Sequence, residues 1–414
     1  MYDVQRIRQG FPYFSAEGAA VYLDNASTTQ KPWPVINAVS GVYQGGMANV
    51  RRGNYRLSRQ TEGLYQRARQ IAGEFLGAAV EKEIIFTRST TESINLVAQC
   101  FCKERLVRGG NIVITEVEHH SNWLPWQALC AEKSAELRVV PIMEGGAEAF
   151  AAALDADTAM AAVADTSNSL GTILPLREMI KAAHGKGIPV LVDGAQAVSH
   201  KEVDVQQMGC DFYCFSGHKL YGPTGIGVLY GKKELLETMA PYQLGGGMVN
   251  QVGERPQENI YAPIPDKFEA GTPNIAGAAG LAAAMEYLRS LGLDNIRRHE
   301  SALYSRLADN LKAIPGAHIL GGRQKHGSII SLGLMGASAY DAGVYLDLRG
   351  IAVRAGEHCA QPLMKRLGLS GALRVSLGIY NDGKEVDLFC EALESFMRLY
   401  GPSRHHISKA KADS

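Results

Sequence analysis

Short apolar segments alternate with amphipathic ones between residues 21 and 239, and this alternation limits the chain to few folds. Four of the apolar segments are predicted as buried strands: Ile112–Thr115, Ala161–Asp165, Val190–Asp193 and Asp211–Phe215. Because strands that alternate with helices pack as a largely parallel sheet, the pattern predicts an α/β fold. Such sheets bind ligands beyond the carboxyl ends of their strands, so we expect the chemistry to gather there.

The chain has 414 residues, which is too long for one compact core, so two domains are expected. We assign 21–285 to a larger domain, and 1–20 with 286–402 to a smaller α+β domain. Within the larger domain, 245–274 carries a glycine triplet and four prolines, which favours a long lid or interface loop. The polar tail 403–414 is predicted to be disordered.

The composition excludes several classes of function. Acidic and basic residues number 42 each, so no net charge draws the chain to nucleic acid or to an anionic membrane. We find no secretory signal and no apolar run of the roughly 18–20 residues that a membrane span needs, which predicts a cytoplasmic protein. Seven cysteines without a C-x-x-C pair predict reduced thiols.

A lysine at a turn is the first candidate for chemistry. Ser216-Gly217-His218-Lys219 follows an apolar strand, and a lysine at a rigid turn is suited to hold a carbonyl cofactor as a Schiff base. Ser216 and His218 could donate hydrogen bonds to a phosphate ester. The alternative is an exposed lysine on a glycine-rich surface turn.

A single carboxylate supports the cofactor interpretation. Asp193 ends the apolar strand Val190–Asp193, and a buried carboxylate is costly without a cationic partner. The pyridinium nitrogen of pyridoxal phosphate (PLP) is such a partner. Gln196 could reach the phenolic oxygen of the same ring. Helix capping is the alternative for Asp193, and a place in the first helical turn is the alternative for Gln196.

Two further groups follow apolar segments. Thr91 lies in a hydroxyl-rich stretch that opens a helix, where free N–H groups can bind an anion, although helix capping explains it nearly as well. His119 follows a strand and could stack on the cofactor ring and transfer protons, whereas a lone histidine is more often structural.

Cys359 is the candidate nucleophile. It follows Arg354 and His358 on a segment interrupted by glycine and proline, which favours an exposed and partly ionised thiol. The remaining cysteines lie in apolar stretches and are predicted to be buried: Cys100, Cys102, Cys130, Cys210, Cys214 and Cys390.

Taken together, these motifs resemble the group II cysteine desulfurases, the branch of class V aminotransferases that includes selenocysteine lyases. The resemblance extends from Tyr22-Leu23-Asp24 to Arg374-Val375-Ser376, and the His-Cys-Ala-Gln-Pro run resembles the cysteine sulfinate desulfinase subgroup. It implies a fold-type-I PLP-dependent transferase with a mostly parallel seven-stranded sheet, working as a homodimer with active sites at the subunit interface.

The resemblance also implies a role for each matching residue. Lys219 is the Schiff-base lysine, Cys359 the nucleophile and His119 the stacking, proton-transferring group. The other implied roles are cofactor binding by Thr91, Asp193, Gln196, Ser216, His218, Gly271 and Thr272, and substrate binding by Asn168, Arg374 and Arg354. Gly271 and Thr272 would reach the phosphate from the partner subunit.

The implied reaction converts L-cysteine to L-alanine, leaves a persulfide on Cys359 and passes the sulfur to a thiol acceptor such as a partner protein. Selenocysteine or cysteine sulfinate lysis, in which the thiol is dispensable, stays open, as does a non-catalytic scaffold. The chain departs from the family pattern at Arg51, Tyr55 and Glu357. A carboxylate near the thiol would tend to raise its pKa and slow desulfuration.

Overall fold

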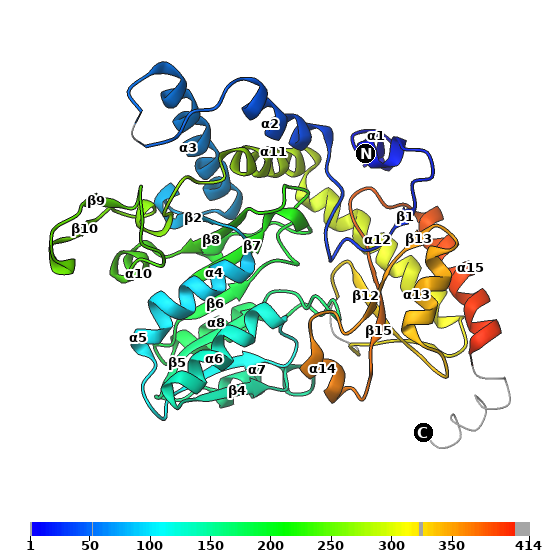
Figure 1. The fold of residues 1–414 in the computed structure, drawn as a ribbon. Helices are drawn as coiled ribbons and strands as arrows, with labels where there is room; N and C mark the ends of the chain where they lie inside the picture. The colour runs from blue at the N-terminus through cyan, green and yellow to red at the C-terminus, as the bar shows by residue number, and fades with distance from the viewer. Residues whose placement is uncertain (1, 52, 323–325, 402–414) are drawn as a thin grey trace.

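The computed structural model describes residues 2–51, 53–322 and 326–401. Figure 1 shows a large sheet with helices on both faces, and beside it a smaller sheet with its own helices. The predicted tail 403–414 lies outside the described residues. The boundaries proposed at 20/21 and 285/286 stay predictions, although the helix α11 (Ile275–Leu291) runs across the second of them.

Seven strands form the large sheet, in the order β2-β8-β7-β6-β5-β3-β4. Neighbours from β7 to β4 pair in parallel, and β8 pairs antiparallel with both β2 and β7. The predicted mostly parallel seven-stranded sheet is therefore confirmed. In chain order the strands are β2 (Ile84–Thr87), β3 (Asn111–Thr115), β4 (Glu136–Val140), β5 (Thr158–Ala164), β6 (Val190–Asp193), β7 (Phe212–Ser216) and β8 (Gly227–Gly231).

The sheet is buried on both faces, which explains why its strands have continuous apolar sequences. All seven residues of β5 are buried, and from Met160 to Val163 successive residues face two separate apolar cores in turn. Val163 packs in one core, whereas Ala162 packs in the other. This arrangement is typical of strands covered by helices on both sides.

Helices on one face of the sheet are α2 (Trp33–Gln44), α3 (Arg56–Leu76), α7 (Ile142–Ala153), α8 (Leu176–His184) and α11. The other face is covered by α4 (Thr90–Val97), which continues through a π-turn into α5 (Lys103–Arg105), and by α6 (Leu124–Lys133) and α10 (Lys233–Thr238). Shorter helices are α1 (Val4–Gln9) and α9 (Val205–Met208).

The smaller sheet is antiparallel, in the order β11-β12-β15-β14, and has its own apolar core. A two-stranded parallel sheet joins β1 to β13 beside it. The strands of these two sheets and the helices near them are β1 (Val21–Tyr22), α12 (Leu293–Lys312), β11 (Ala317–Ile319), β12 (Ile329–Leu334), α13 (Ala339–Asp347), β13 (Ile351–Ala352), β14 (Arg354–Gly356), α14 (Gln361–Arg366), β15 (Ala372–Ser376) and α15 (Gly383–Tyr400).

The segment 245–274, predicted as a loop without periodicity, contains a short antiparallel hairpin of β9 (Val249–Gln251) and β10 (Ile260–Tyr261). Figure 1 shows this hairpin extending away from the large sheet. Its strands are too short to give an alternating pattern that sequence reasoning could detect.

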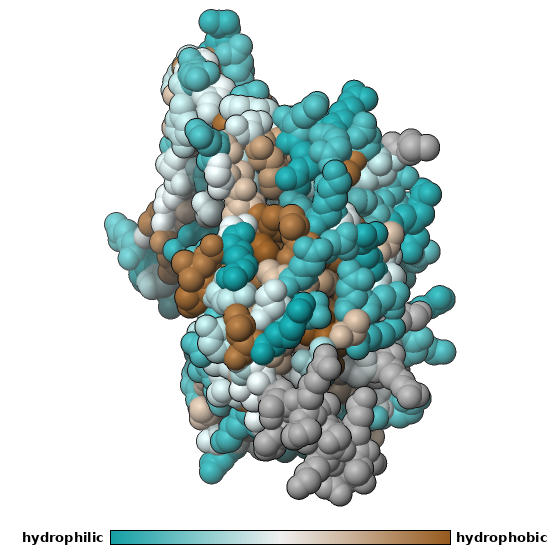
Figure 2. All heavy atoms as spheres, turned by 90° about the vertical axis from the view of Figure 1, so that its right-hand side faces the viewer, coloured by the Kyte–Doolittle hydropathy of each residue, from teal (hydrophilic) through white to brown (hydrophobic). Residues whose placement is uncertain are grey.

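The surface seen from the α13 and α15 side is mostly hydrophilic, with apolar side chains gathered in its middle (Figure 2). Tyr340, Val344 and Leu348, spaced by one helical turn, are exposed on α13 and just beyond its end. Among the described residues, no helix has the length and apolar character needed to cross a membrane.

Candidate active site

A cavity of about 330 Å³ lies where the carboxyl ends of the parallel strands meet the smaller sheet. Its volume is at the lower end of the roughly 300–1,000 Å³ typical of small-molecule sites. It brings together eleven of the residues proposed from the sequence: Thr91, His119, Asn168, Asp193, Gln196, Ser216, His218, Lys219, Arg354, Cys359 and Arg374.

Lys219 is held on a short turn after β7. The 3₁₀ turn Gly217–Lys219 is closed by the Leu220 N–H, which donates to Gly217 O. The carbonyl oxygen of His218 accepts a hydrogen bond from the Thr29 N–H (3.1 Å) and another from the Lys31 ammonium (2.8 Å). Burial lowers the pKa of Lys219, although the Asp193 carboxylate opposes the effect. The turn therefore presents an amine that loses its proton more readily than an exposed lysine does.

Asp193 is buried at the end of β6, as its position after an apolar strand predicts. Its Oδ1 accepts a hydrogen bond from the Ala195 N–H (2.9 Å), and burial raises its pKa. Gln196 donates from Nε2 to Ala26 O (2.8 Å), so its side chain is anchored to the N-terminal segment. A buried carboxylate in this position is suited to hold a proton on a heterocyclic nitrogen.

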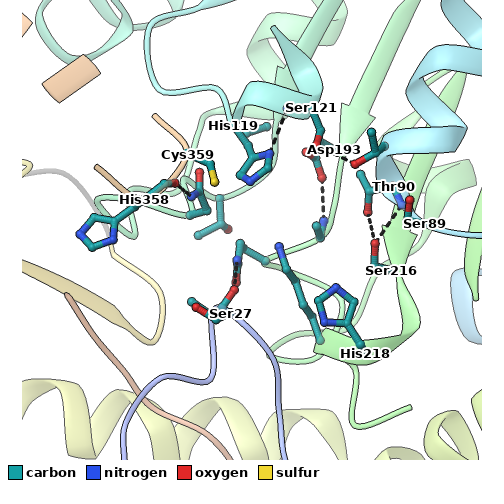
Figure 3. Close-up of a pocket in the computed structure, with 18 of the residues that line it drawn as sticks. Ser27, Ser89, Thr90, His119, Ser121, Asp193, Ser216, His218, His358 and Cys359 are labelled. Atoms are coloured by element: carbon teal, nitrogen blue, oxygen red, sulfur yellow. Dashed lines mark hydrogen bonds between the residues drawn. The ribbon is translucent and has the colours of Figure 1, made fainter. Parts of the chain in front are cut away.

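Hydroxyl groups gather at the N-terminus of α4 (Figure 3). Ser216 Oγ accepts a hydrogen bond from the Thr90 N–H and forms a second hydrogen bond with Thr90 Oγ1, both at 2.8 Å. Thr91 Oγ1 lies 2.7 Å from Ser121 Oγ. Hydroxyls and N–H groups at a helix N-terminus provide the donors that a phosphate ester requires.

His119 lies beyond β3 and is held by its own loop. The Ser121 N–H donates to His119 Nδ1 (3.0 Å), which places the ring proton of the neutral imidazole on Nε2. Burial and the Lys219 charge lower the pKa of His119 to about 3. The ring is therefore neutral at physiological pH and can face another ring without repulsion between charges.

An acidic residue joins the two cavity arginines. Arg374 Nη2 lies 3.2 Å from Asp24 Oδ1, and Arg354 Nη2 lies 2.7 Å from Asp24 Oδ2. Arg374 Nη1 also donates to Asn168 O (2.8 Å). Among the described residues, Arg374 Nε and Asn168 Oδ1 are buried without a hydrogen-bond partner, which leaves both available to a ligand carboxylate or ammonium group.

Cys359 is exposed, whereas the other six cysteines are buried as predicted. It sits in the left-handed backbone region (φ 52°), as does His358 (φ 54°). In Figure 3 the Cys359 sulfur points toward the His119 ring, and the His358 ring points away from the cavity. Glu357, one of the departures from the family pattern, accepts a hydrogen bond from the Gln361 amide (2.6 Å).

Gly271 and Thr272 are the site residues that the described chain does not bring to this cavity. Thr272 lines a separate cavity beside Phe268 and Glu269, and Gly271 adopts a positive φ (85°). Arg51, which also departs from the family pattern, donates a hydrogen bond to Glu269 O (2.7 Å) near this segment. Tyr55, the third departure, is exposed at the start of α3.

Sequence reasoning assigned no role to several residues that line or support the cavity. Asp24 has the same signal as Asp193, because it is a carboxylate directly after an apolar strand. Ser27 donates a hydrogen bond to Asp24 and accepts one from Arg374. Thr90 is adjacent to the predicted Thr91, but no local pattern distinguishes the two.

Comparison with known proteins agrees with this architecture. The sequence profile of the family described as aminotransferase class-V matches residues 21–389. The chain belongs to the class V aminotransferase family. It is 45% identical to a cysteine desulfurase from Salmonella agona (strain SL483) over 406 residues, and the alignment covers 97% of this chain and 100% of that protein.

Two solved structures of cysteine desulfurases have the same fold as this chain. The cysteine desulfurase CsdA from Escherichia coli superposes with a TM-score of 0.89 at 37% identity, covering 97% of this chain and 100% of that one. A cysteine desulfurase from Thermococcus onnurineus NA1 superposes with a TM-score of 0.90 at 37% identity, covering 95% and 98%.

The residues around the cavity fit the PLP cofactor of this family. The buried Asp193 carboxylate would hold the ring nitrogen, the neutral His119 ring would cover the ring face, and the hydroxyls at the α4 N-terminus would hold the phosphate. Arg374 Nε and Asn168 Oδ1, which are buried and have no partner among the residues that the structure describes, are available to bind a substrate.

Proposed function

We infer that the chain is a PLP-dependent cysteine desulfurase, which converts L-cysteine to L-alanine and transfers the sulfur to Cys359 as a persulfide. The observation that carries this conclusion is an exposed thiol in the same cavity as a partly buried lysine and a buried carboxylate. The 45% identity to a cysteine desulfurase over nearly the whole chain supports the same activity.

The proposed roles follow from the contacts of each residue. Lys219 would hold the cofactor, and Asp193 would keep its ring nitrogen protonated. Ser216, Thr91 and His218 would hold the phosphate, and Gln196 would donate to the phenolic oxygen. When bound, the cofactor supplies an electron sink for the carbanion formed at the substrate Cα.

The protein's own groups then bind the substrate and move its protons and sulfur. Arg374 and Asn168, assisted by Arg354, would bind the carboxylate of L-cysteine. Lys219, with its lowered pKa, would remove the Cα proton. The Cys359 thiolate would attack the substrate sulfur, so that an S–S bond forms as the C–S bond breaks. His119 Nε2 would carry a proton during this step.

The partners and the location of the protein belong to the proposal as well. We propose a homodimer in which Gly271 and Thr272 complete the phosphate site of the partner subunit, because both lie away from the cavity of their own chain. The persulfide would pass to a thiol acceptor such as a partner protein. The protein would work in the cytoplasm, where thiols stay reduced.

A Cys359→Ala variant tests the function. The wild type should form alanine and sulfide equivalents from L-cysteine, whereas the variant should lose at least about 100-fold in rate, as expected when a covalent nucleophile is removed. Visible absorbance before and after L-cysteine is added would show that the variant still binds cofactor and substrate.

The outcomes separate the alternatives. Loss of alanine formation with an intact absorbance change supports the desulfurase. Equal rates in Cys359→Ala and wild type would overturn the assigned role of the thiol, and retained cleavage of cysteine sulfinate alone would favour the desulfinase. Absence of a bound yellow cofactor in the wild type would point to a non-catalytic protein.

A further inference from the structure

The nucleophile lies on a strained backbone turn. His358 and Cys359 are consecutive residues with φ of 54° and 52°. Residues other than glycine, asparagine and aspartate seldom adopt this left-handed backbone conformation. Such a conformation persists only where the surrounding contacts over-determine it. The contacts that hold this turn therefore decide where the thiol points.

Those contacts come from the segments that follow two strands of the large sheet, β3 and β5. The His120 N–H donates to Cys359 O (2.8 Å), and Asn168 Nδ2 donates to His358 O (2.6 Å). The His120 side chain makes a further bond, because its Nε2 accepts from the Gln361 N–H (3.1 Å). Gln361 begins α14, whose first N–H groups have no partner within the helix.

His120 thus binds the chain at Cys359 and again two residues later. We propose that His120 is a positioning residue that fixes the Cys359 turn against the loop carrying His119. The backbone donor of His120 holds Cys359 O and its ring acceptor holds the Gln361 N–H, and His119 directly precedes His120 in the chain. The distance between the thiol and the His119 ring therefore depends on His120, while Asn168 holds the preceding residue, His358.

This inference rests on the proposed function, since it assigns a purpose to the position of Cys359. It predicts that the accessibility of the Cys359 thiol to solvent and its reactivity toward the substrate change in opposite directions. Without the ring acceptor the turn relaxes, so the thiol becomes more accessible to solvent while it spends less time aimed at the substrate. A misplacement of about 1 Å can cost about 100-fold in rate.

His120→Leu tests the proposal, with His120→Gln as the matched control because a glutamine oxygen can accept from the Gln361 N–H at a similar reach. We expect Leu to lower kcat for L-cysteine roughly 10- to 100-fold while leaving KM and the substrate-induced absorbance change near wild type. Alkylation of Cys359 by iodoacetamide should become several-fold faster. Gln should restore both properties.

Thermal unfolding and cofactor absorbance identify a variant that fails to fold. In that case His120→Ala tests the same bond without a branched apolar side chain. Unchanged kcat and alkylation in either folded variant would overturn the proposal, as would a fall of the Gln variant to the level of Leu. Failure of the desulfurase assignment would look different, since Cys359→Ala would then match wild type in rate.

Discussion

Two arginines with different surroundings line the cavity, and their burial separates their roles. The Arg374 side chain is 4% exposed and its buried Nε has no hydrogen-bond partner in the described part of the chain, whereas the Arg354 side chain is 50% exposed. A hydrogen bond to a charged group is worth more when water does not compete. Arg374 is therefore the stronger ligand for a substrate carboxylate, although both arginines share Asp24.

We predict that Arg374→Lys lowers kcat/KM for L-cysteine roughly 10- to 150-fold, equivalent to about 1.5–3 kcal/mol. Lysine keeps the charge but lacks the planar fork of donors. Steady-state alanine formation over a range of L-cysteine concentrations measures the effect. Arg354→Lys is the matched control and should lose clearly less. Equal losses in the two variants would contradict the assignment.

At the scale of elements, a buried ion pair joins α3 to the segment that carries Gly271 and Thr272. Arg69 Nη1 lies 2.8 Å from Glu269 Oε1, and the two side chains are 1% and 2% exposed. Burial alone would raise the pKa of Glu269, but the Arg69 charge and the hydrogen bonds from Phe86 N–H and Tyr65 hold it below its usual value. Glu269 is therefore a charged anchor.

Glu269→Ala should lower the free energy of unfolding by roughly 3–5 kcal/mol, because it leaves the Arg69 guanidinium buried and unpaired. Urea denaturation monitored by circular dichroism provides the measurement. Glu74→Ala serves as control, since its pair with Arg289 is exposed and should contribute no more than about 1 kcal/mol. A Glu269→Ala protein as stable as the control would show that the pair is not an anchor.

Arg51, where the family pattern has a histidine, contacts the same anchor. Its Nη2 lies 3.1 Å from Glu269 Oε2 and 3.1 Å from Asp266 Oδ1. A guanidinium keeps its charge across the physiological pH range, whereas histidine does not. The departure therefore gives this chain a permanently charged link between the residue 51 turn and the 266–272 segment.

At the scale of the whole molecule, one buried and two partly buried histidines connect stability to pH. Burial lowers the pKa of His358 and His119 to about 3 and that of His218 to about 4, from an ordinary value of 6.5. The unfolded chain therefore binds more protons than the folded one below pH 6.5. Stability is present above that value and is lost as the pH falls toward about 4.

The measurable prediction concerns His358, whose ring points away from the cavity (Figure 3). Each such histidine should cost about 1.4 kcal/mol per pH unit between pH 6.5 and the lowered pKa. Asparagine tolerates the left-handed backbone region, so His358→Asn is the variant to test. Between about pH 7 and about pH 5 its unfolding free energy should fall less steeply than that of the wild type, by about 1.4 kcal/mol per pH unit below pH 6.5. Parallel declines in wild type and variant would refute it.

The sequence by itself was enough to predict the central strands of the large sheet and several residues at their ends. The expected strand Val190–Asp193 matches β6, and the expected strand Ile112–Thr115 falls within β3, because burial on both faces leaves a continuous apolar run. The same logic located Asp193 and Lys219, since polar residues that follow an apolar strand stand out.

Only the tertiary structure decided which distant residues meet. Asp24 reaches Arg374 across 350 positions of the chain, and His120 reaches Gln361 across 241. No periodicity records such pairs, because each depends on how two separately folded elements pack. The left-handed turn at Cys359 has the same origin: no local pattern favours it, and contacts from Asn168 and His120 hold it in place.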